Sequence, residues 1–342
     1  MKRVLAPVLV VAALCAAGIA GFQWMTEPLS PPGAPGPVKI IDIPDGASFR
    51  QVAALLKREG VIASQWAFLL LGKLTAADRK ILAGEYALHS GMRPPDILAD
   101  MQNGRVVLHS VTIPEGLTAV QIADLLEQKG LAEKGEFIGL VHDRNFIRSL
   151  SLETASLEGY LFPDTYRFPR GEKVRDVIQT MVAGLWRVFT PELQTRAREV
   201  NMTPHQVLTL ASLIEKETSV GEERALVSSV FHNRLKRRIP LQSDPTVIYG
   251  LAAFNGNLTK RDLAVASPYN TYRVAGLPPG PIAGPGADSI RAALYPASTN
   301  YLYFVARNDG THKFSSTLIE HNRAVDKYQP RRPARHVDGR HS

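Results

Sequence analysis

The chain of 342 residues contains a single cysteine, Cys15, which lies inside an uncharged N-terminal run. The rest of the sequence therefore has no thiol for a disulfide or for a thiolate nucleophile. The nine histidines show no H-E-x-x-H pattern or paired spacing, so we expect neither a metal site nor a cofactor. No G-x-S-x-G elbow occurs, and the glycine-rich segment 276–286 lacks the lysine and strand–helix context of a phosphate loop. Candidate chemistry is therefore sought among the carboxylates.

The net charge of +8 is concentrated in two places, a cluster at 234–238 and a tail at 331–342. The basic residues concerned are Arg234, Lys236, Arg237 and Arg238 in the cluster, and Arg331, Arg332, Arg335 and Arg340 in the tail. Either group can be ordinary solvated surface, and we predict that the tail is disordered. No motif for nucleic-acid recognition accompanies them, so no nucleic-acid partner is expected. An anionic polymer or lipid headgroups are the more suitable partners.

Residues 4–25 contain no charged side chain. At about 1.5 Å per residue, a helix over this run spans a hydrocarbon core of roughly 30 Å. Lys2 and Arg3 precede it, so the positive-inside rule places residues 1–3 in the cytoplasm and the bulk of the chain outside. A cleaved signal peptide is the alternative. The length of the run and Trp24 at its outer edge favour a retained single-pass membrane anchor.

The remaining sequence predicts an α+β protein in two parts behind a proline- and glycine-rich linker at 26–37. A small α+β module is expected at 38–111, with strands at 38–43 and 84–88 and helices at 48–59, 65–74 and 94–102. A larger α+β domain is expected at 112–330. Its predicted helices are 119–129, 133–141, 174–189, 191–200, 203–217, 222–237 and 317–328. Residues 301–306 read as a strand of the buried type.

Two carboxylates, Glu215 and Glu217, end the helix predicted at 203–217, where its apolar stripe of Val207, Leu210 and Ile214 should continue. A carboxyl group beside an apolar surface tends to have a raised pKa, because desolvation penalises its charged form. Such a group suits acid catalysis of glycosidic bond cleavage. The alternative is a solvated helix end. Residues two apart on a helix point roughly 200° away from each other, so only one of the two can face a given groove. Periodicity leaves the choice between them open.

Several short sequence motifs help to choose between Glu215 and Glu217. E-K-E-T, H-N-R-L, Q-S-D-P-T-V-I-Y-G, S-P-Y-N-T-Y and G-L-P-P-G-P-I follow one another between 215 and 282. T-I-P-E-G-L-T, L-E-G-Y-L-F-P-D-T-Y, Y-L-Y-F-V-A and H-N-R-A-V flank them. In this order they resemble the endolytic murein transglycosylases, the MltG or YceG-like family, over nearly the whole chain.

The resemblance implies that Glu217, the second glutamate of E-K-E-T, is the catalytic acid. It also implies a membrane-anchored lytic transglycosylase whose catalytic domain faces the periplasm and acts on peptidoglycan glycan strands. Such an enzyme cuts nascent strands between MurNAc and GlcNAc, leaves 1,6-anhydro ends, limits strand length and works with peptidoglycan synthases. The order of elements in the small module resembles a LysM-like domain, which either grips glycan or serves only as a packing domain.

A second group of candidates surrounds the Q-S-D-P-T word. Asp244 stands before a proline and a short predicted helix, so it either caps that helix or acts as a second carboxylate. Gln242, Ser243 and Thr246 offer hydrogen bonds suited to the N-acetyl and hydroxyl groups of a sugar.

Further candidates are more distant in sequence. Tyr249, Tyr269 and Tyr272 either stack on sugar faces or belong to the core. Asn233 is a candidate for orienting Glu217 or the substrate. Glu158 either faces the same cleft or forms an ion pair with an arginine.

Two alternative functions are also compatible with these residues. One is a peptidoglycan hydrolase in which Glu217 is the acid and Asp244 activates water. The other is a non-enzymatic wall-binding scaffold, for which Glu217→Gln leaves glycan turnover unchanged.

Overall fold

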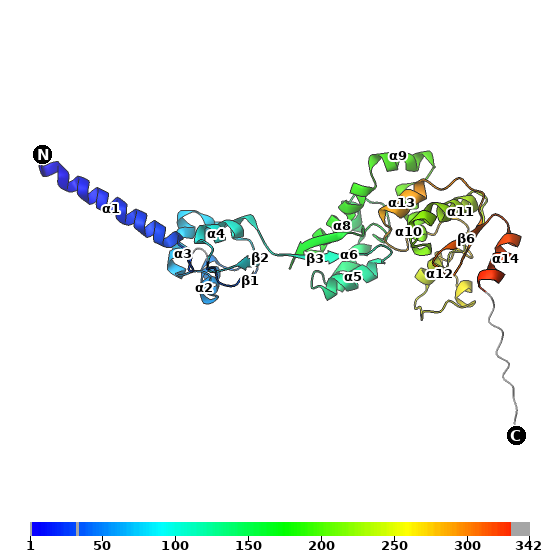
Figure 1. Cartoon of the computed structure of the whole chain (residues 1–342), viewed down its shortest axis with the longest axis horizontal. Helices are drawn as coiled ribbons and strands as arrows, with labels where there is room; N and C mark the ends of the chain where they lie inside the picture. Colours follow the sequence, from blue (N-terminus) through cyan, green and yellow to red (C-terminus); the bar gives the residue numbers. More distant parts are fainter. Residues whose placement is uncertain (1, 32–33, 330–342) are drawn as a thin grey trace, which may run out of the picture. The chain divides into compact units, whose positions relative to one another are not determined.

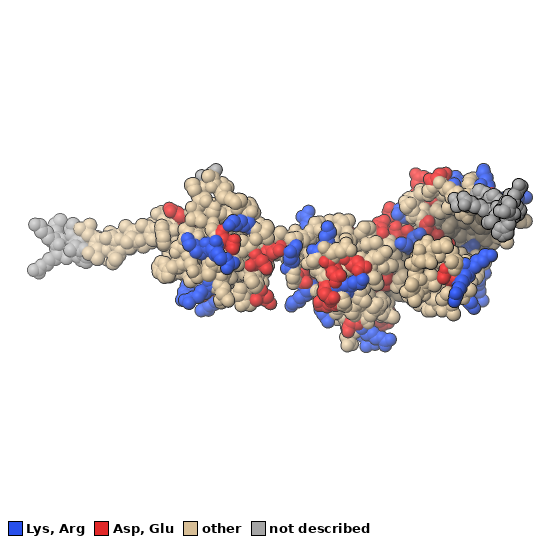
Figure 2. All heavy atoms as spheres, turned by 90° about the horizontal axis from the view of Figure 1, so that it is seen from below, with Lys and Arg blue, Asp and Glu red and all other residues tan. Residues whose placement is uncertain are grey.

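The computed structural model describes residues 2–31 and 34–329, and Figure 1 shows their mixed helical and strand structure. Two compact units emerge from the contacts within the chain. Unit 1 comprises Met1–Ser110 with Arg167–Glu172, and unit 2 comprises Val111–Tyr166 with Lys173–Ser342. The basic tail predicted at 331–342 lies outside the described residues. On the face shown in Figure 2, acidic and basic side chains are interspersed over the surface.

The N-terminal run forms one long helix, α1 (Lys2–Thr26). Its 19-residue stretch Val8–Thr26 contains an 18-residue window with a mean hydropathy of 2.0, and large apolar side chains such as Leu14 and Trp24 are exposed. By length and composition this stretch is able to cross a membrane, which fits a single-pass anchor. Cys15 is also exposed on this helix.

The proline-rich segment after α1 is hydrogen-bonded to the loop around Ser90. The Ser30 amide donates to the Ser90 carbonyl oxygen at 2.9 Å, and the two hydroxyl groups lie 2.6 Å apart. The Gly36 amide donates to the Ser90 hydroxyl at 3.1 Å. The described part of this segment is therefore joined to the rest of unit 1 by several polar contacts.

Unit 1 is built on the antiparallel pair β1 (Lys39–Ile43) and β2 (Gly84–Leu88), with Lys39 opposite Leu88. Between the strands come α2 (Phe49–Arg58), α3 (Gln65–Leu74) and the 3₁₀ turn η1 (Ala77–Arg79), and α4 (Pro94–Asn103) follows β2. Ser48 caps α2 in a reciprocal capping box with Gln51, which explains why the helix begins there. The strands and helices predicted for this region are confirmed.

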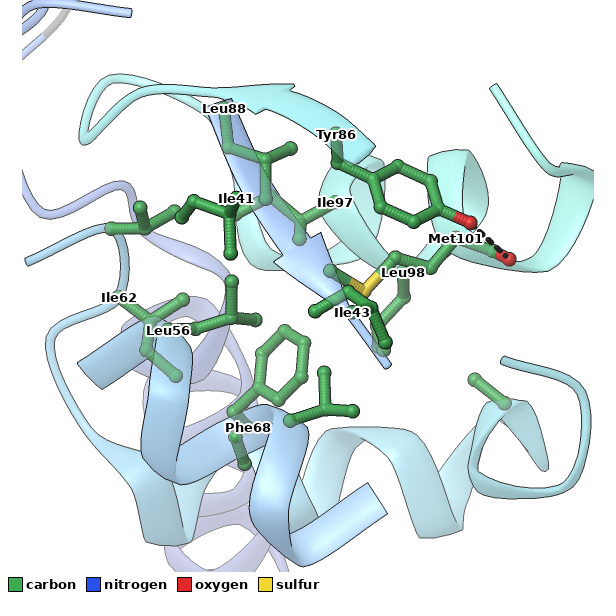
Figure 3. Close-up of a cluster of buried hydrophobic side chains, with 14 of the residues drawn as sticks. Ile41, Ile43, Leu56, Ile62, Phe68, Tyr86, Leu88, Ile97, Leu98 and Met101 are labelled. Atoms are coloured by element: carbon green, nitrogen blue, oxygen red, sulfur yellow. Dashed lines mark hydrogen bonds between the residues drawn. The ribbon is translucent and has the colours of Figure 1, made fainter. Parts of the chain in front are cut away.

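The core of unit 1 is drawn in Figure 3. Ile41 and Ile43 point inward from β1, and Tyr86 points inward from β2, because alternate residues of a strand share one face. Leu56 and Phe68 meet them from the helices. The Tyr86 hydroxyl satisfies its hydrogen bonding at the edge of this core by donating to the carbonyl oxygens of Leu82 and Met101, at 2.8 and 3.3 Å.

The chain passes between the units through β3 (Leu108–Thr112) and β4 (Thr165–Pro169), which form a two-stranded sheet. The helices of unit 2 are, in chain order, α5 (Ala119–Gln128), α6 (Lys134–His142), α7 (Arg144–Ser149), α8 (Val174–Val188), α9 (Pro191–Glu199), α10 (Pro204–Glu217), α11 (Arg224–Lys236), α12 (Asp244–Gly250), α13 (Ala287–Leu294) and α14 (Leu318–Tyr328). Short 3₁₀ turns occur at η2 (Gly221–Glu223) and η3 (Asp262–Ala264).

Helix α10 is central to unit 2. Thr203 caps its first turn in a box with Gln206, and every residue from Val207 to Ile214 is buried. It packs against α13, α11 and α12, and Figure 1 shows these helices gathered around it. Because residues 207–214 of α10 are buried, its polar side chains reach the surface at its two ends. The C-terminal end of α10 carries Glu217 into a pocket.

The strand predicted at 301–306 differs from the prediction in its burial. Residues 303–306 form β5 (Tyr303–Ala306), which pairs antiparallel with β6 (His312–Ser315) in a two-stranded ribbon. Within β5 only Val305 is buried, so the prediction of a buried-type strand is wrong. The apolar run instead forms one wall of an open pocket.

Candidate active site

Glu217 is the last residue of α10, and its carboxylate is partly buried in unit 2. The Ser243 hydroxyl donates to Glu217 Oε1 at 2.5 Å. Glu217 lies in the wall of an open pocket of about 400 Å³. The polar and aromatic residues that line this pocket with it are Arg234, Gln242, Asp244, Tyr272, Tyr303, Phe304, His312, His321 and Gln329. The apolar stripe of α10 thus delivers a carboxyl group into a pocket.

The pKa of Glu217 is raised to about 7. Burial is the main cause, because desolvation disfavours the carboxylate. The hydrogen bond from Ser243 favours the charged form and lowers the pKa, whereas the nearby charge of Asp244 raises it. A substantial fraction of Glu217 therefore holds its proton near neutral pH, as a general acid must.

Glu215 and Lys216 point to a different side of α10. Glu215 Oε2 accepts a hydrogen bond from the Gly286 amide at 2.9 Å, and the Lys216 ammonium donates to the Gly116 carbonyl oxygen at 3.1 Å. Arg224 lies 3.7 Å from Glu215 and 3.8 Å from Glu115. These contacts join the P-E-G turn of the T-I-P-E-G-L-T word to α10. Only Glu217 of the two glutamates lines the pocket.

Asp244 is the first residue of α12, and Ser243 is the residue that stands at the cap position. The Asp244 carboxylate makes no capping hydrogen bond; instead the Tyr272 hydroxyl donates to it at 2.6 Å. The predicted capping role is therefore wrong. The helix begins one residue earlier than the Asp-Pro pattern suggests, with Pro245 in its first turn, and so the Asp244 carboxylate is left facing the pocket beside Glu217.

The loop before α12 is held by hydroxyl groups. The Ser243 amide donates to Thr271 Oγ1 at 3.0 Å, and Thr246 Oγ1 donates to the Ser243 carbonyl oxygen at 2.6 Å. The Thr246 and Thr271 hydroxyls lie 2.8 Å apart. Ser243 and Thr246 are buried, so Thr246 supports Ser243 and is not itself part of the pocket wall.

Gln242 and Arg234 form the next part of the wall. Gln242 adopts a left-handed backbone with φ of 53°, and its side-chain oxygen accepts from Arg234 Nη1 at 3.0 Å. Arg234 is only 6% exposed, whereas Lys236, Arg237 and Arg238 are exposed. The basic cluster seen in the sequence is therefore divided: one arginine is buried at the pocket and the other three basic residues face solvent.

Glu158 and Tyr249 lie together, apart from this pocket. The two carboxylate oxygens of Glu158 accept from the Ala119 amide at 3.0 and 3.2 Å, and the Tyr249 hydroxyl donates to Glu158 at 3.3 Å. Burial raises the pKa of Glu158 to about 7. The Tyr249 ring packs on the Tyr269 ring at 4.8 Å. No arginine pairs with Glu158 in the described parts of the chain, so neither predicted role of Glu158 matches its contacts.

Asn233 has a supporting position one residue before Arg234. Its side-chain amide donates to the carbonyl oxygens of Thr299 and Tyr301, both at 2.9 Å. Asn233 does not line the pocket, and it holds the segment that leads into β5. Of the predicted site residues, the pocket wall contains Glu217, Gln242, Asp244 and Tyr272, with buried Ser243 behind them.

The pocket wall made by β5, β6 and α14 was not predicted from the sequence. Tyr303 stacks on His321 with ring centroids 5.1 Å apart, and His312 Nδ1 lies 2.7 Å from Glu223 Oε2. The signal was present in the words Y-L-Y-F-V-A and H-N-R-A-V, which carry Tyr303 and His321. Among the residues that the structure describes, no group of three His, Cys, Asp or Glu residues is placed to hold a metal ion.

The pocket therefore combines a carboxyl group whose pKa is raised to about 7, a second carboxylate and a set of aromatic residues. A combination of this kind is suited to acid catalysis of glycosidic bond cleavage. Comparison of the sequence with family models places the chain in a known group. Residues 41–327 match the YceG-like family, and the chain belongs to that family.

Similar proteins agree with this assignment. The chain is 36% identical to the endolytic murein transglycosylase of Bacillus subtilis, over 84% of each chain. It is 31% identical to the endolytic murein transglycosylase of Streptococcus pneumoniae D39, over 93% of this chain and 63% of that protein. A crystal structure of a YceG-like protein from Listeria monocytogenes is 35% identical, with a TM-score of 0.58 over 84% of this chain and 98% of that one.

Proposed function

We propose that this protein is an endolytic lytic transglycosylase that cleaves the MurNAc–GlcNAc bond within peptidoglycan strands and leaves 1,6-anhydro-MurNAc ends. The observation that carries the proposal is the position of Glu217. It combines a raised pKa, a hydrogen bond from Ser243 and a place in an open pocket. The names of the Bacillus and Streptococcus relatives support the same activity.

In the first step, protonated Glu217 donates its proton to the oxygen that links the muramoyl sugar to the next N-acetylglucosamine. The glycosidic C–O bond breaks, the leaving sugar departs as an alcohol, and positive charge develops at the anomeric carbon. The negative charge of Asp244 on the same pocket wall stabilises this charge and also favours the protonated form of Glu217 beforehand.

In the second step, the Glu217 carboxylate takes the proton from the C6 hydroxyl of the same muramoyl sugar. The C6 oxygen attacks the anomeric carbon and closes the anhydro ring, so the acid is restored and no water is consumed. The attacking hydroxyl belongs to the reacting sugar and has a high effective concentration. One carboxyl group can therefore act twice, with Ser243 holding it in place through both steps.

A hydrolase of the same polymer is the second candidate, and the position of Asp244 favours it. Asp244 lines the pocket with Glu217 and accepts a hydrogen bond from Tyr272, so it is a candidate base for activating water. Digestion of purified glycan strands followed by mass spectrometry separates the two reactions. Anhydro ends are lighter by one water than hydrolytic reducing ends. Products with reducing ends only would overturn the transglycosylase proposal, and unchanged turnover by Glu217→Gln would favour a non-enzymatic scaffold.

The cellular role follows from the anchor and from the reaction. In this proposal helix α1 anchors the enzyme in the membrane, and the positive-inside rule supports Lys2 and Arg3 on the cytoplasmic side with the catalytic domain in the periplasm. At the membrane surface it meets strands as they are made, cuts them internally, limits their length and works beside the peptidoglycan synthases. Labelling of surface-exposed cysteine variants in intact cells and in spheroplasts tests this orientation.

Unit 1 serves as a LysM-like glycan-binding module in this proposal. Its order of strand, two helices and strand supports the assignment, as does a pocket between the loop at 44–47 and α2. Asp45 and Arg58 line that pocket. In a Glu217→Gln background that blocks cleavage, we expect Asp45→Ala with Arg58→Ala to reduce retention of the full chain on insoluble peptidoglycan. Retention equal to that of the parent variant would assign unit 1 a packing role instead.

A further inference from the structure

Arg234 is a buried cation without an anionic partner in the described parts of the chain. Its side chain is enclosed by α11, the 240–242 loop and the start of the β5 ribbon, and it is 6% exposed. Nε donates to the Leu302 carbonyl oxygen at 2.7 Å. Nη1 donates to the carbonyl oxygens of Pro240 and Leu241 and to Gln242 Oε1, at 2.9–3.1 Å. All four acceptors are neutral.

A guanidinium in this setting keeps its charge. Burial lowers the pKa of Arg234, but arginine remains protonated far above neutral pH. Taking a charge out of water is costly, and neutral carbonyl groups compensate it only in part. The remaining amino group, Nη2, donates to no residue within 2–31 or 34–329, and Arg234 lines the same pocket as Glu217. A positive charge is therefore held at the wall of the pocket in which the reaction takes place.

Two neighbours extend this part of the wall. The guanidinium carbon lies 5.1 Å from the centroid of the Tyr303 ring, which orients the planar group. His321 stacks on the Tyr303 ring, and its Nδ1 is buried without a hydrogen-bond partner among the described residues. Both side chains line the pocket. Hydrogen-bonding groups at a pocket wall that have no protein partner are available to a polar group of a ligand or to water.

We propose that Arg234, with Tyr303 and His321 beside it, forms a carboxylate-binding subsite that fixes the position of the strand relative to Glu217. This inference rests on the proposed function, since it names the part of the peptidoglycan strand that the subsite takes. The muramoyl sugar carries a lactyl ether that ends in a free carboxylate when no peptide is attached. When a stem peptide is attached, that group is an amide and the carboxylates belong to the peptide. The free Nη2 group of Arg234 can donate a charge-assisted hydrogen bond to either carboxylate.

The competing explanation is that Arg234 only holds the 240–242 loop in place. Gln242→Glu separates the two explanations without removing the arginine. The new carboxylate occupies the position of the Gln242 amide oxygen, 3.0 Å from Arg234 Nη1, so it neutralises the cation and preserves the loop contact. A structural clamp is maintained or strengthened by this change. A carboxylate subsite is blocked by it.

The experiment uses full-length protein in detergent and four glycan preparations. Peptide-free strands and stem-bearing strands are each supplied native and with their carboxylates converted to amides by carbodiimide coupling. For the wild type, we expect amidation to lower kcat/KM about tenfold, mainly through KM, as for loss of one charge-assisted contact of ~1.4 kcal/mol. We expect Gln242→Glu to abolish this difference while its melting temperature stays at or above that of the wild type. Arg234→Lys keeps the charge but replaces the planar, anchored guanidinium by a flexible ammonium group, so it should retain a smaller preference.

The outcomes are distinct. A preference limited to peptide-free strands assigns the lactyl carboxylate, and a preference limited to stem-bearing strands assigns the peptide carboxylates. Equal cleavage of native and amidated strands by the wild type would overturn the subsite, as would a preference that persists in Gln242→Glu. The new charge in Gln242→Glu can also change the pKa of Glu217. This effect alters kcat/KM equally for native and amidated strands, so it cancels in the ratio of the two values. Failure of the wild type to cleave any strand would overturn the proposed function itself, and the subsite with it.

Discussion

The Ser243 hydroxyl donates to the Glu217 carboxylate at 2.5 Å, and this bond joins the start of α12 to the end of α10. Ser243 occupies the cap position of α12, where a serine usually accepts a hydrogen bond from its own helix. Here the side chain makes no capping bond and serves Glu217 instead. The residue at the cap position therefore orients the side chain of the candidate catalytic acid and lowers its pKa.

The first prediction concerns the pH dependence of activity. The Ser243 hydrogen bond lowers the pKa of Glu217 and the Asp244 charge raises it. Ser243→Ala should therefore move the alkaline limb of the kcat/KM profile to higher pH, and Asp244→Asn should move it to lower pH, each by up to about one unit. The profiles are measured from the rate of new chain ends between pH 5 and 9. Shifts of both variants in the same direction would contradict this account of the site.

The second prediction compares the two neighbouring glutamates. Glu217→Gln removes the proton donor and should lower kcat by about 10²–10⁴-fold with an intact fold. Glu215→Gln is the matched control, since Glu215 accepts from the Gly286 amide and lies 3.7 Å from Arg224. It should lower stability by about 2 kcal/mol and leave the remaining folded enzyme active. Turnover assays and urea unfolding of both variants decide the matter. The reverse pattern would place the working acid at Glu215.

The third prediction concerns stability and pH. The pKa of Glu217 is about 7 in the folded protein and 4.5 in its ordinary environment. The folded state therefore binds this proton more tightly, so the contribution of Glu217 to stability is full below pH 4.5 and declines as the pH rises to 7. Glu217→Gln, which does not ionise, should gain on the order of 2 kcal/mol relative to the wild type between pH 5 and pH 8.

Melting temperatures of the two proteins across this range provide the measurement. Glu158→Gln offers a comparison, because the pKa of Glu158 is also raised to about 7 by burial. It should show the same sign of pH dependence without the loss of turnover expected for Glu217→Gln. A difference between wild type and Glu217→Gln that is constant with pH would show that Glu217 is not desolvated in solution.

The fourth prediction concerns unit 1. Leu56 is fully buried among Ile41, Ile43 and Phe68, so Leu56→Ala should destabilise unit 1 by about 2–5 kcal/mol. Because unit 2 has its own core around α10, kcat on short soluble strands should be unchanged at temperatures where unit 2 stays folded. Thermal unfolding followed together with activity tests this. Loss of activity in step with the unfolding of unit 1 would show that the two cores are coupled.

Much of the local structure could be predicted from neighbouring residues. Helix α3 and strand β2 have the bounds expected for them, and α2 begins where Ser48 and Gln51 close a capping box. Such signals act over three or four residues and need no other part of the chain. Helix α13 was missed, because its eight residues lie in a proline-rich region with few local signals. Its position against α10 comes from packing, which is a property of the whole unit.

The candidate site likewise has features that follow from local sequence and features that depend on tertiary packing. The amino-acid sequence by itself determined that a carboxyl group would end the apolar stripe of α10, and the family words selected Glu217 over Glu215. Only the tertiary structure decided that Ser243 would reach Glu217, that Asp244 would face the pocket rather than cap its helix, and that Arg234 would be buried beside them. The physical reason is that helix periodicity is set by adjacent residues. A pocket wall is assembled from segments far apart in the chain, whose meeting depends on how the entire core packs.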